Sequence, residues 1–346
     1  MNAEILVTVA RGGIVESIHR GHLAVVDGDG NLIAGLGNPE TVTFLRSAAK
    51  PFQAIPFLLS GAAERFGFNE KEIALACASH NSEPVHTETA ARMLEKGSFA
   101  EKDLRCGAHE PFSIEIARLL LCRDEKPSQL HNNCSGKHAA MLAFARQINA
   151  RAEDYDSPEN PVQQQILEII ERFSGVPRSE IGVGIDGCSA PNFALPLVNL
   201  ARMLGKLILP PENFSTELRE ACRRIVTAMM SYPEMIGGEN PKRLDTLLMR
   251  ALRGQIVSKI GAEGVYTAGI LPNPRWKRGL GIALKIEDGS DRRARPVAVL
   301  EALRQLGILN PQEHDSLKPF ALIKLRNHRK TLVGEAAPNF SLKFNQ

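Results

Sequence analysis

The sequence predicts an α+β fold, in which strands from both ends of the chain form one antiparallel sheet packed with helices, beside a mostly helical lobe. Strand-like segments with turn signals lie in residues 4–37 and 254–337, while helical periodicity dominates the residues between them. The chain has 346 residues, 43% of them hydrophobic, which is enough to bury a large core.

The strands at the two ends are predicted from alternation and turn residues. Residues 4–21 favour one hairpin, and residues 22–37 favour a second, with Asp-Gly and Gly-Asn at its turn. Near the C-terminus, strands are expected within 254–271 and 278–289, then a helix at about 296–306 and a last strand at 330–337.

The helices are predicted from apolar residues at helical spacing and from N-terminal caps. They are expected at about 47–60, 70–78, 84–97, 136–149, 161–174, 190–204, 214–231 and 241–253. No internal repeat or low-complexity linker divides the chain, and the loop with Pro158 and Pro161 reads as the approach to a helix. We therefore expect a single domain over 1–346, with a sheet lobe of about 1–60 and 255–346 and a helical lobe of about 61–254.

Charge and composition argue against several classes of protein. The formal net charge is only +3, with 42 basic and 39 acidic residues, and the short basic run 292–295 is more typical of a solvated helix start than of a nucleic-acid patch. The N-terminus does not have the pattern of a secretory signal, and no apolar run is long enough for a membrane span. We expect a cytoplasmic protein that binds neither nucleic acid nor membrane, with reduced cysteines.

The segment RSAAKPFQ, residues 46–53, contains the pattern Ser-x-x-Lys. Three residues are nearly one helical turn, so the amine of Lys50 and the hydroxyl of Ser47 would share one face. A neutral lysine there could accept the hydroxyl proton. The alternative is a helix-capping serine followed by a solvated lysine, because so short a pattern also arises by chance.

Three further polar turns each lie just before a predicted helix. Residues 79–81, Ser-His-Asn, follow a small apolar run and could be functional or simply caps. In residues 131–143, Cys134 and Lys137 are three apart at a helix start, and residues 182–197 deliver Asp186 and Cys188 to another. Spacing alone leaves a zinc site, a disulfide and two plain thiols equally open, because two cysteines supply only half of a usual zinc site.

Together these segments resemble the hallmark blocks of the L-asparaginase II family, the rhizobial-type asparaginases. The blocks are RSAAKPFQAIPFL, ASHNSEPVHTETAARML, HNNCSGKHAAMLA and GIDGCSAPNFALPL, in that order, and the similarity extends to GAEGVYTAGI and GLGIALKIEDG near the C-terminus. The resemblance implies a single asparaginase II domain with a fold similar to serine β-lactamases and glutaminases. It also implies hydrolysis of L-asparagine to L-aspartate and ammonia, and a homodimer.

The resemblance further implies roles for individual residues. Two serine–lysine tandems would be catalytic, Ser47 with Lys50 and Ser79 with Lys259, and Ser47 is the favoured nucleophile. The resemblance also implies a zinc ion, with ligands Cys134, Lys137 and Cys188. A lysine ligand must be deprotonated, and nothing in the spacing suggests one.

The zwitterionic substrate needs a cation for its α-carboxylate and polar acceptors for its ammonium group. Arg46, Asn133 and His138 are candidates for this recognition, although each has an ordinary structural explanation as well. Asp186 is expected beside the metal, where it could orient a bound water or the substrate. Selectivity between asparagine and glutamine depends on pocket depth, which the sequence does not reveal.

Three other functions compete with this interpretation. A glutaminase or penicillin-recognising amidohydrolase would share Ser47 and Lys50, but its Ser-Asp-Asn and Lys-Thr-Gly companions are missing. A cysteine-nucleophile amidase would use Cys134 or Cys188 in place of serine. A non-catalytic protein that binds zinc or an amino acid would have no use for two serine–lysine tandems.

Overall fold

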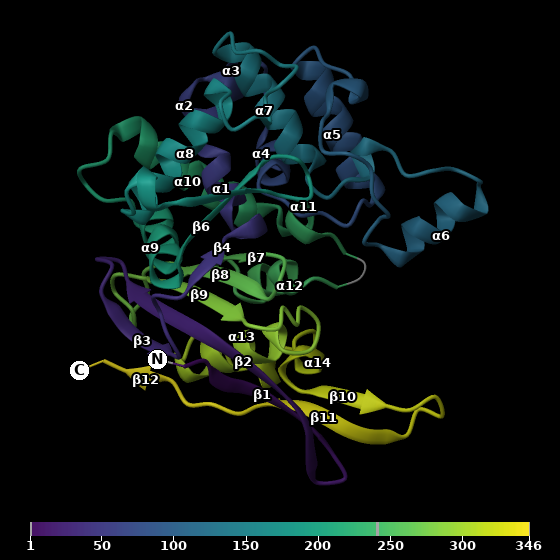
Figure 1. The fold of residues 1–346 in the computed structure, drawn as a ribbon, viewed down its shortest axis with the longest axis vertical. Coiled ribbons are helices and arrows are strands. Elements are labelled where there is room, and N and C mark those ends of the chain that lie inside the picture. The colour runs from purple at the N-terminus through teal and green to yellow at the C-terminus, as the bar shows by residue number, and fades with distance from the viewer. Residues whose placement is uncertain (1, 240–241, 346) are drawn as a thin grey trace. The chain divides into compact units, whose positions relative to one another are not determined.

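The computed structural model describes residues 2–239 and 242–345. The chain divides into two compact units. The first unit contains Met1–Ala48, Leu195–Leu209 and Leu247–Gln346, and the second contains Ala49–Ala194 and Pro210–Thr246. The first is built around a sheet and the second mostly from helices (Figure 1).

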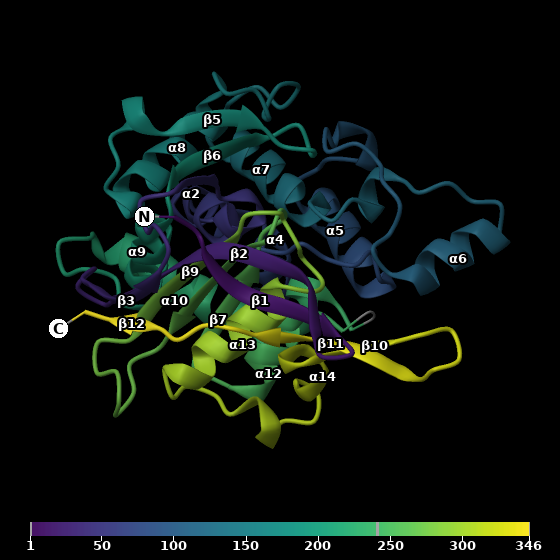
Figure 2. The ribbon, with the colours of Figure 1, turned by 60° about the horizontal axis from the view of Figure 1, so that its bottom comes forward.

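An antiparallel sheet forms the first unit, with neighbouring strands in the order β10-β11-β1-β2-β9-β8-β7, and β3 pairs with both β2 and β12. Its strands are β1 (Glu4–Arg11), β2 (Ile14–Asp27), β3 (Leu32–Leu36), β7 (Ile256–Ile260), β8 (Val265–Ile270), β9 (Leu280–Ile286), β10 (Ile323–Arg326), β11 (Leu332–Pro338) and β12 (Lys343–Phe344). Figure 2 shows the N-terminal strands beside the yellow C-terminal strand, as the pairing of β1 with β11 requires. The predicted α+β class, with its sheet made from both ends of the chain, is confirmed.

The two predicted N-terminal hairpins are wrong in one respect, because β2 is a single strand that runs through both. It pairs with β1 in its first half, with β3 in its second half, and with β9 along residues 21–27. Gly21, the last residue of the first predicted hairpin, lies inside the strand, where a Cβ would collide with the Lys285 carbonyl. The glycine therefore permits a close approach of backbones instead of a reversal.

Helices α9 (Leu197–Ile208) and α13 (Arg295–Gln305) pack on opposite faces of this sheet. On one face, a Cβ at Gly281 would collide with the carbonyl of Ala201 in α9, so the helix lies directly on β9. On the other face, Ile282 and Leu284 line a small apolar space with residues of α13. Because both faces are covered, β7, β8 and β9 are buried almost throughout, which explains their nearly continuous apolar sequence.

The remaining elements of the first unit are short. They are β4 (Val42–Phe44), the 3₁₀ turns η1 (Arg46–Ala49) and η5 (Pro311–Glu313), and α14 (Lys318–Ala321). The η1 turn crosses into the second unit at its last residue, and α12 (Leu244–Ala251) also spans both units. The strands β10 and β12 were not predicted, since each has four residues or fewer.

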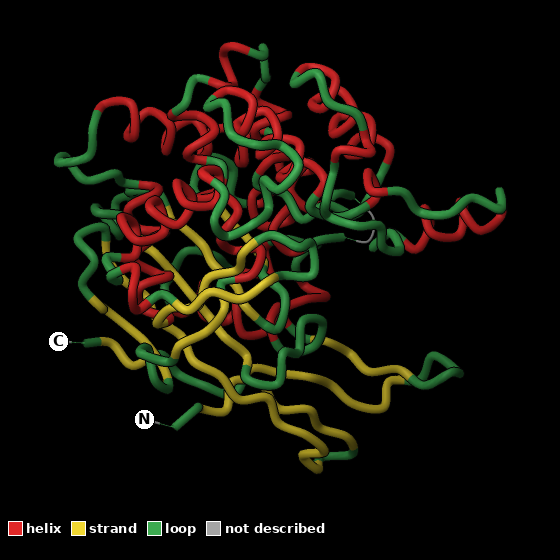
Figure 3. The backbone as a smooth tube through the Cα atoms, turned by 45° about the horizontal axis from the view of Figure 1, so that its top comes forward, coloured by secondary structure: helices red, strands yellow, loops and turns green. Residues whose placement is uncertain are grey.

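The second unit is mostly helical, as the red segments of Figure 3 show. Its helices are α1 (Lys50–Gln53), α2 (Ile55–Leu59), α3 (Ala62–Arg65), α4 (Glu70–Ala76), α5 (Pro84–Lys96), α6 (Ile114–Cys122), α7 (Ser135–Gln147), α8 (Pro161–Ser174), α10 (Thr216–Ser231) and α11 (Pro233–Gly237). It also contains the 3₁₀ turns η2 (Glu101–Asp103), η3 (Gln129–His131) and η4 (Arg178–Glu180). The strand β5 (Gly182–Ile185) pairs antiparallel with β6 (Pro191–Pro196).

Local signals placed most of these helices correctly. The predicted helix 161–174 is α8, which Asn160 caps through its side chain and Gly175 ends in a left-handed conformation. The predicted helix 190–204 is wrong at its start, because residues 191–196 form β6 and the helix begins only after Pro196. The predicted helix 47–60 is broken into η1, α1 and α2, and α6 was not predicted.

The predicted lobes differ from the two units at three places: residues 49–60, 195–209 and 247–254. The largest difference concerns α9, which the prediction gave to the helical lobe. In the structure α9 contacts β2, β8 and β9 and so belongs with the sheet. The prediction that both units form one asparaginase II domain stays a prediction.

Candidate active site

The Ser-x-x-Lys segment begins at a strained residue and ends in a buried lysine. Arg46 has a φ of 51°, a conformation that non-glycine residues adopt at a cost, and its guanidinium lies 3.8 Å from Glu263. Ser47 follows in the η1 turn and is half-buried, whereas the Lys50 side chain begins α1 and is buried. Pro51 is tolerated here because the first turn of a helix does not need its N–H.

The Lys50 amine contacts a second serine, Ser79. It donates hydrogen bonds to the Ala78 carbonyl at 2.5 Å, to the Ser79 hydroxyl at 3.0 Å and to the Asn133 carbonyl at 3.4 Å. These partners come from two loops that are 29 and 83 residues away along the chain. Spacing predicted a partnership with Ser47, and the contact with Ser79 is one that spacing could not predict.

Ser79 lies in a buried polar loop, residues 78–82, between α4 and α5. Residues 78–82 do not cap α5. That helix is capped by its own first residues, where the Glu83 backbone N–H donates to the His86 ring. Another segment holds the backbone of this loop, since the Ser79 N–H donates to the Ile236 carbonyl at 3.0 Å. A buried loop with this many satisfied polar groups is costly to build, which is typical of a functional segment.

His80 fixes this loop against the start of α7. Its Nδ1 accepts a hydrogen bond from the Ser82 N–H at 3.1 Å, so its Nε2 carries the proton and donates to the Ser135 hydroxyl at 2.9 Å. The ring also stacks on His86, with 5.0 Å between centroids. Burial lowers the pKa of His80 well below its usual value, with a further contribution from His86, and the ring is therefore a neutral structural group.

The turn 131–134 connects the Lys50 contact to the two cysteines. The side chain of Asn132 donates to the carbonyls of Cys106 and Gly107 and accepts from the Cys134 N–H at 2.8 Å. The next residue, Asn133, accepts the Lys50 amine through its carbonyl. This turn is therefore stiff, and it places Asn133 beside the proposed base.

Cys134, Lys137 and Cys188 lie together, as the resemblance implied. All three are nearly fully buried, and the Lys137 amine donates to the Cys188 sulfur at 3.2 Å. The hydrogen bond from Cys134, together with the nearby Lys137 charge, lowers the pKa of Cys188 strongly against the effect of burial. The same hydrogen bond and burial raise the pKa of Cys134.

This cluster fits a zinc ion in its donor chemistry. Two sulfur atoms and an amine are soft to intermediate ligands of the kind that zinc accepts, and burial would protect them. Within residues 2–239 and 242–345, no group of three His, Cys, Asp or Glu side chains is placed to hold a metal ion. A site here therefore needs Lys137 as its third protein ligand. Against the effect of burial, the two cysteines and Asp186 raise the pKa of Lys137 above its usual value, so a bound ion would have to displace its proton.

The remaining predicted residues have distinct environments. Asp186 is partly exposed, and its side chain accepts the Gly187 N–H at 2.8 Å. His138 is fully buried, its Nδ1 lies 2.7 Å from the Tyr155 hydroxyl, and burial lowers its pKa. Its role in substrate recognition stays a prediction.

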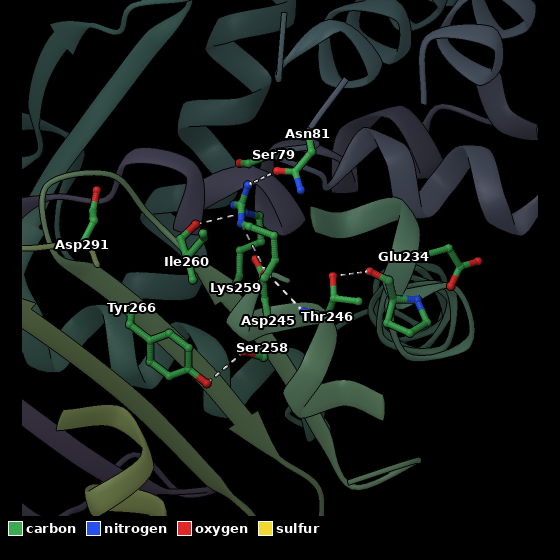
Figure 4. Close-up of polar contacts among 12 residues, drawn as sticks. Ser79, Asn81, Glu234, Asp245, Thr246, Ser258, Lys259, Ile260, Tyr266 and Asp291 are labelled. Carbon is green, nitrogen blue, oxygen red and sulfur yellow. Dashed lines mark hydrogen bonds and ion pairs between the residues drawn. The ribbon is translucent and has the colours of Figure 1, made fainter. Parts of the chain in front are cut away.

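Lys259 lies in the first unit, in the fully buried strand β7. Its amine donates to the Ile260 carbonyl at 2.9 Å. The neighbouring Ser258 points to the other face of the strand, where its hydroxyl lies 2.9 Å from that of Tyr266 (Figure 4). Ser79 belongs to the second unit, and the pairing of Ser79 with Lys259 stays a prediction.

Two contacts of the site were missed by sequence reasoning. The Arg243 guanidinium donates to the Asn81 side-chain oxygen at 2.7 Å, and it lies 4.0 Å from the buried carboxylate of Asp245. The imidazole of His109 contacts Asn133. Neither residue belongs to a spaced motif, and no local signal in the sequence could have identified them.

The strands, helices and buried Ser79–Lys50 contact define an α+β protein with a candidate serine–lysine site. The family model described as L-asparaginase II matches residues 7–338, nearly the whole chain. The chain therefore belongs to the L-asparaginase II family, and the resemblance seen in the sequence is confirmed. That family is named for an enzyme that hydrolyses a linear amide.

Comparison with solved structures gives more distant likenesses. The native form of Mglu is 16% identical with a TM-score of 0.43, over 86% of this chain and 66% of its own. A probable glutaminase from Bacillus subtilis, complexed with 6-diazo-5-oxo-L-norleucine, is 12% identical with a TM-score of 0.40, over 83% of this chain and 84% of its own. This chain thus spans slightly less than two thirds of the length of native Mglu, and TM-scores below 0.5 carry no argument about its activity.

No curated protein matches this chain. Among the helices of residues 2–239 and 242–345, none has both the length and the apolar character required for a membrane span.

Proposed function

We propose that this protein is an amidohydrolase that converts L-asparagine and water to L-aspartate and ammonia. The observation that carries the proposal is the buried Lys50 amine, 3.0 Å from the Ser79 hydroxyl, in a member of the L-asparaginase II family. An unactivated serine is a weak nucleophile, and an adjacent lysine is one of the groups that can accept its proton. The same family membership leads us to propose a homodimer.

In the proposed reaction, the Ser47 hydroxyl attacks the carbon of the side-chain amide. Lys50 accepts the hydroxyl proton and returns it to the amide nitrogen, so that the C–N bond breaks and ammonia leaves. The resulting ester with Ser47 is then hydrolysed by water, which restores the hydroxyl and releases L-aspartate. We propose that backbone N–H groups near Ser47 stabilise the oxyanion.

Ser79 contacts the proposed base, Lys50. Its hydroxyl accepts a hydrogen bond from the Lys50 amine, and we propose Lys259 as its partner in a second serine–lysine tandem. The same contact makes Ser79 the alternative nucleophile, because its hydroxyl already contacts the Lys50 amine. We propose that Arg46, Asn133 and His138 recognise the charged groups of the substrate.

Cys134, Lys137 and Cys188 are the residues that would hold zinc, with Asp186 beside them. When bound, the ion supplies a positive charge that can orient and polarise a substrate oxygen. The chain's own contribution is to keep the three donors buried and close together, as the hydrogen bond from Lys137 to Cys188 supports. Loss of its proton on metal binding would then convert Lys137 from a hydrogen-bond donor to a ligand.

The proposal is tested by ammonia release from L-asparagine and, separately, from L-glutamine, with purified protein and buffer blanks. We expect turnover of L-asparagine and a much lower rate with L-glutamine. A diazoketone analogue of asparagine, followed by peptide mapping, would identify the alkylated serine as Ser47 or Ser79. Binding of L-asparagine without any ammonia release would favour a non-catalytic amino-acid-binding protein and refute the proposal.

The zinc assignment predicts that Cys188→Ala loses bound metal. We expect about one zinc per chain in the unaltered protein and less than about a tenth of that in the variant, because two remaining donors are too few for a structural site. Metal analysis of the purified proteins measures this. Cys122→Ala, which changes an exposed cysteine of α6, is the matched control and should keep its zinc. Equal zinc in the Cys188→Ala protein would contradict the ligand set.

A further inference from the structure

His109 is a part-exposed residue between η2 and α6, and it lies outside every motif of the sequence. Its Nε2 accepts a hydrogen bond from the backbone N–H of Asn133 at 3.0 Å. Because Nε2 accepts, the ring proton lies on Nδ1, which donates to the Glu110 carbonyl at 2.7 Å. The tautomer of the ring is therefore fixed by the two backbone groups it joins.

Stacking also holds the ring in this orientation. Its face lies against Phe112, with 5.1 Å between ring centroids and 29° between planes. The side-chain oxygen of Asn133 lies 3.3 Å from Nε2 and accepts the thiol of Cys134 at 3.3 Å. Since Nε2 and this oxygen are both acceptors, within Asn133 His109 is hydrogen-bonded only to the backbone, and the side chain of Asn133 is its neighbour.

Asn133 connects His109 to the proposed catalytic groups. Its carbonyl accepts the Lys50 amine at 3.4 Å and the His80 N–H at 3.3 Å. A shift of the Asn133 backbone would therefore move both its carbonyl, which accepts from the Lys50 amine, and its side-chain amide. His109 itself is bonded to neither Lys50 nor Ser79.

We propose that His109 is a positioning residue, whose Nε2 holds the backbone of Asn133 and thereby fixes the Asn133 side chain for substrate recognition. This inference rests on the proposed function, since it assigns the geometry of that same site. Without this hydrogen bond, the Asn133 backbone would be held through its carbonyl alone, while its side-chain oxygen would keep the Cys134 thiol. Loss of the acceptor should therefore weaken substrate binding more than it slows the chemical step.

Two variants distinguish the effect of the Nε2 acceptor of His109 from the effect of its flat ring. His109→Phe keeps a flat ring against Phe112 but cannot accept a hydrogen bond, whereas His109→Gln keeps an acceptor oxygen on a side chain of similar length. We expect His109→Phe to raise KM for L-asparagine by about fivefold, with kcat changed by less than about twofold, the size expected for one hydrogen bond. His109→Gln should return KM to within about twofold of the unaltered protein.

The exchange rate of the Asn133 amide proton, measured by NMR, provides a readout that does not depend on activity. It should increase by about tenfold in His109→Phe and remain near its original value in His109→Gln. A control, His314→Phe, changes a half-buried histidine of the other unit and should alter neither KM nor this exchange rate.

The outcomes separate this proposal from the proposed function. Equal KM values for His109→Phe and His109→Gln, or an unchanged Asn133 exchange rate in His109→Phe, would overturn the positioning role. Absence of ammonia release from the unaltered protein would refute the amidohydrolase proposal and with it the recognition role. The exchange measurement would still decide whether His109 holds the Asn133 backbone.

Discussion

Lys50→Met is expected to lower kcat for ammonia release by about a thousandfold, the scale of a lost general base. Methionine retains most of the buried volume of the lysine side chain but has no amine to accept the serine proton. The change also leaves the Ala78 carbonyl and the Ser79 hydroxyl without their shared donor, at a cost of about 1–3 kcal/mol of stability for an unsatisfied buried group. Steady-state kinetics of ammonia release, with a thermal unfolding curve for each protein, measure both effects.

A matched control distinguishes the loss of a catalytic base from the loss of one positive charge. Lys71→Met removes an exposed lysine of α4 and should leave kcat within about twofold of the original value, because surface substitutions have small effects. A Lys50→Met protein that is folded and retains more than a tenth of the original kcat would exclude Lys50 as the base for either serine. Attention would then turn to Lys259, which is also fully buried.

Gly136→Ala is expected to destabilise the second unit by about 3 kcal/mol, at the upper end of the usual cost of overpacking. Gly136 lies in the first turn of α7, where a Cβ would be 2.5 Å from Leu75 Cγ and 2.6 Å from the Leu75 carbonyl oxygen. Part of this contact is backbone, so no side-chain rotation relieves it, and α4 and α7 must separate. Urea unfolding followed by circular dichroism measures the shift.

The same helix carries Lys137, so this variant also tests how the fold supports the site. Gly187→Ala is the control, because a Cβ at Gly187 meets nothing within 4 Å and its φ is ordinary. Its stability should change by less than about 0.5 kcal/mol. Equal stability of both variants would show that α4 and α7 can move apart at little cost, contrary to their close packing.

The arrangement of the site has a simple physical consequence for the proposed chemistry. Lys50 lies where two buried loops meet, and one backbone carbonyl from each loop accepts a hydrogen bond from its amine. Both loops are held by further hydrogen bonds, through His80 to Ser135 and through Asn132 to the Cys106 carbonyl. The amine is therefore placed by the fold before any substrate binds, which is what efficient proton transfer requires.

The sequence was most informative where structure depends on neighbouring residues. The cap at Asn160 and the glycine at 175 determine the limits of α8, and alternating apolar residues with turn signals determine the C-terminal strands. The sequence was misleading where a residue is needed for a contact with a distant part of the chain. Two hairpins were predicted to meet at Gly21, but β2 continues through this glycine, which is needed for the approach of Lys285, 264 residues further along the chain.

In the candidate site, too, some features could be predicted from the sequence and others required the tertiary structure. By itself, the sequence determined the family, through four ordered motifs. The site residues Ser47, Lys50, Cys134, Lys137 and Cys188 that these motifs imply stay predictions. Only the tertiary structure decided that the Lys50 amine donates to the Ser79 hydroxyl and that His109 accepts a hydrogen bond from the Asn133 N–H. Motifs and caps are set by short-range backbone geometry, whereas these contacts depend on how loops far apart in the sequence pack around a buried amine.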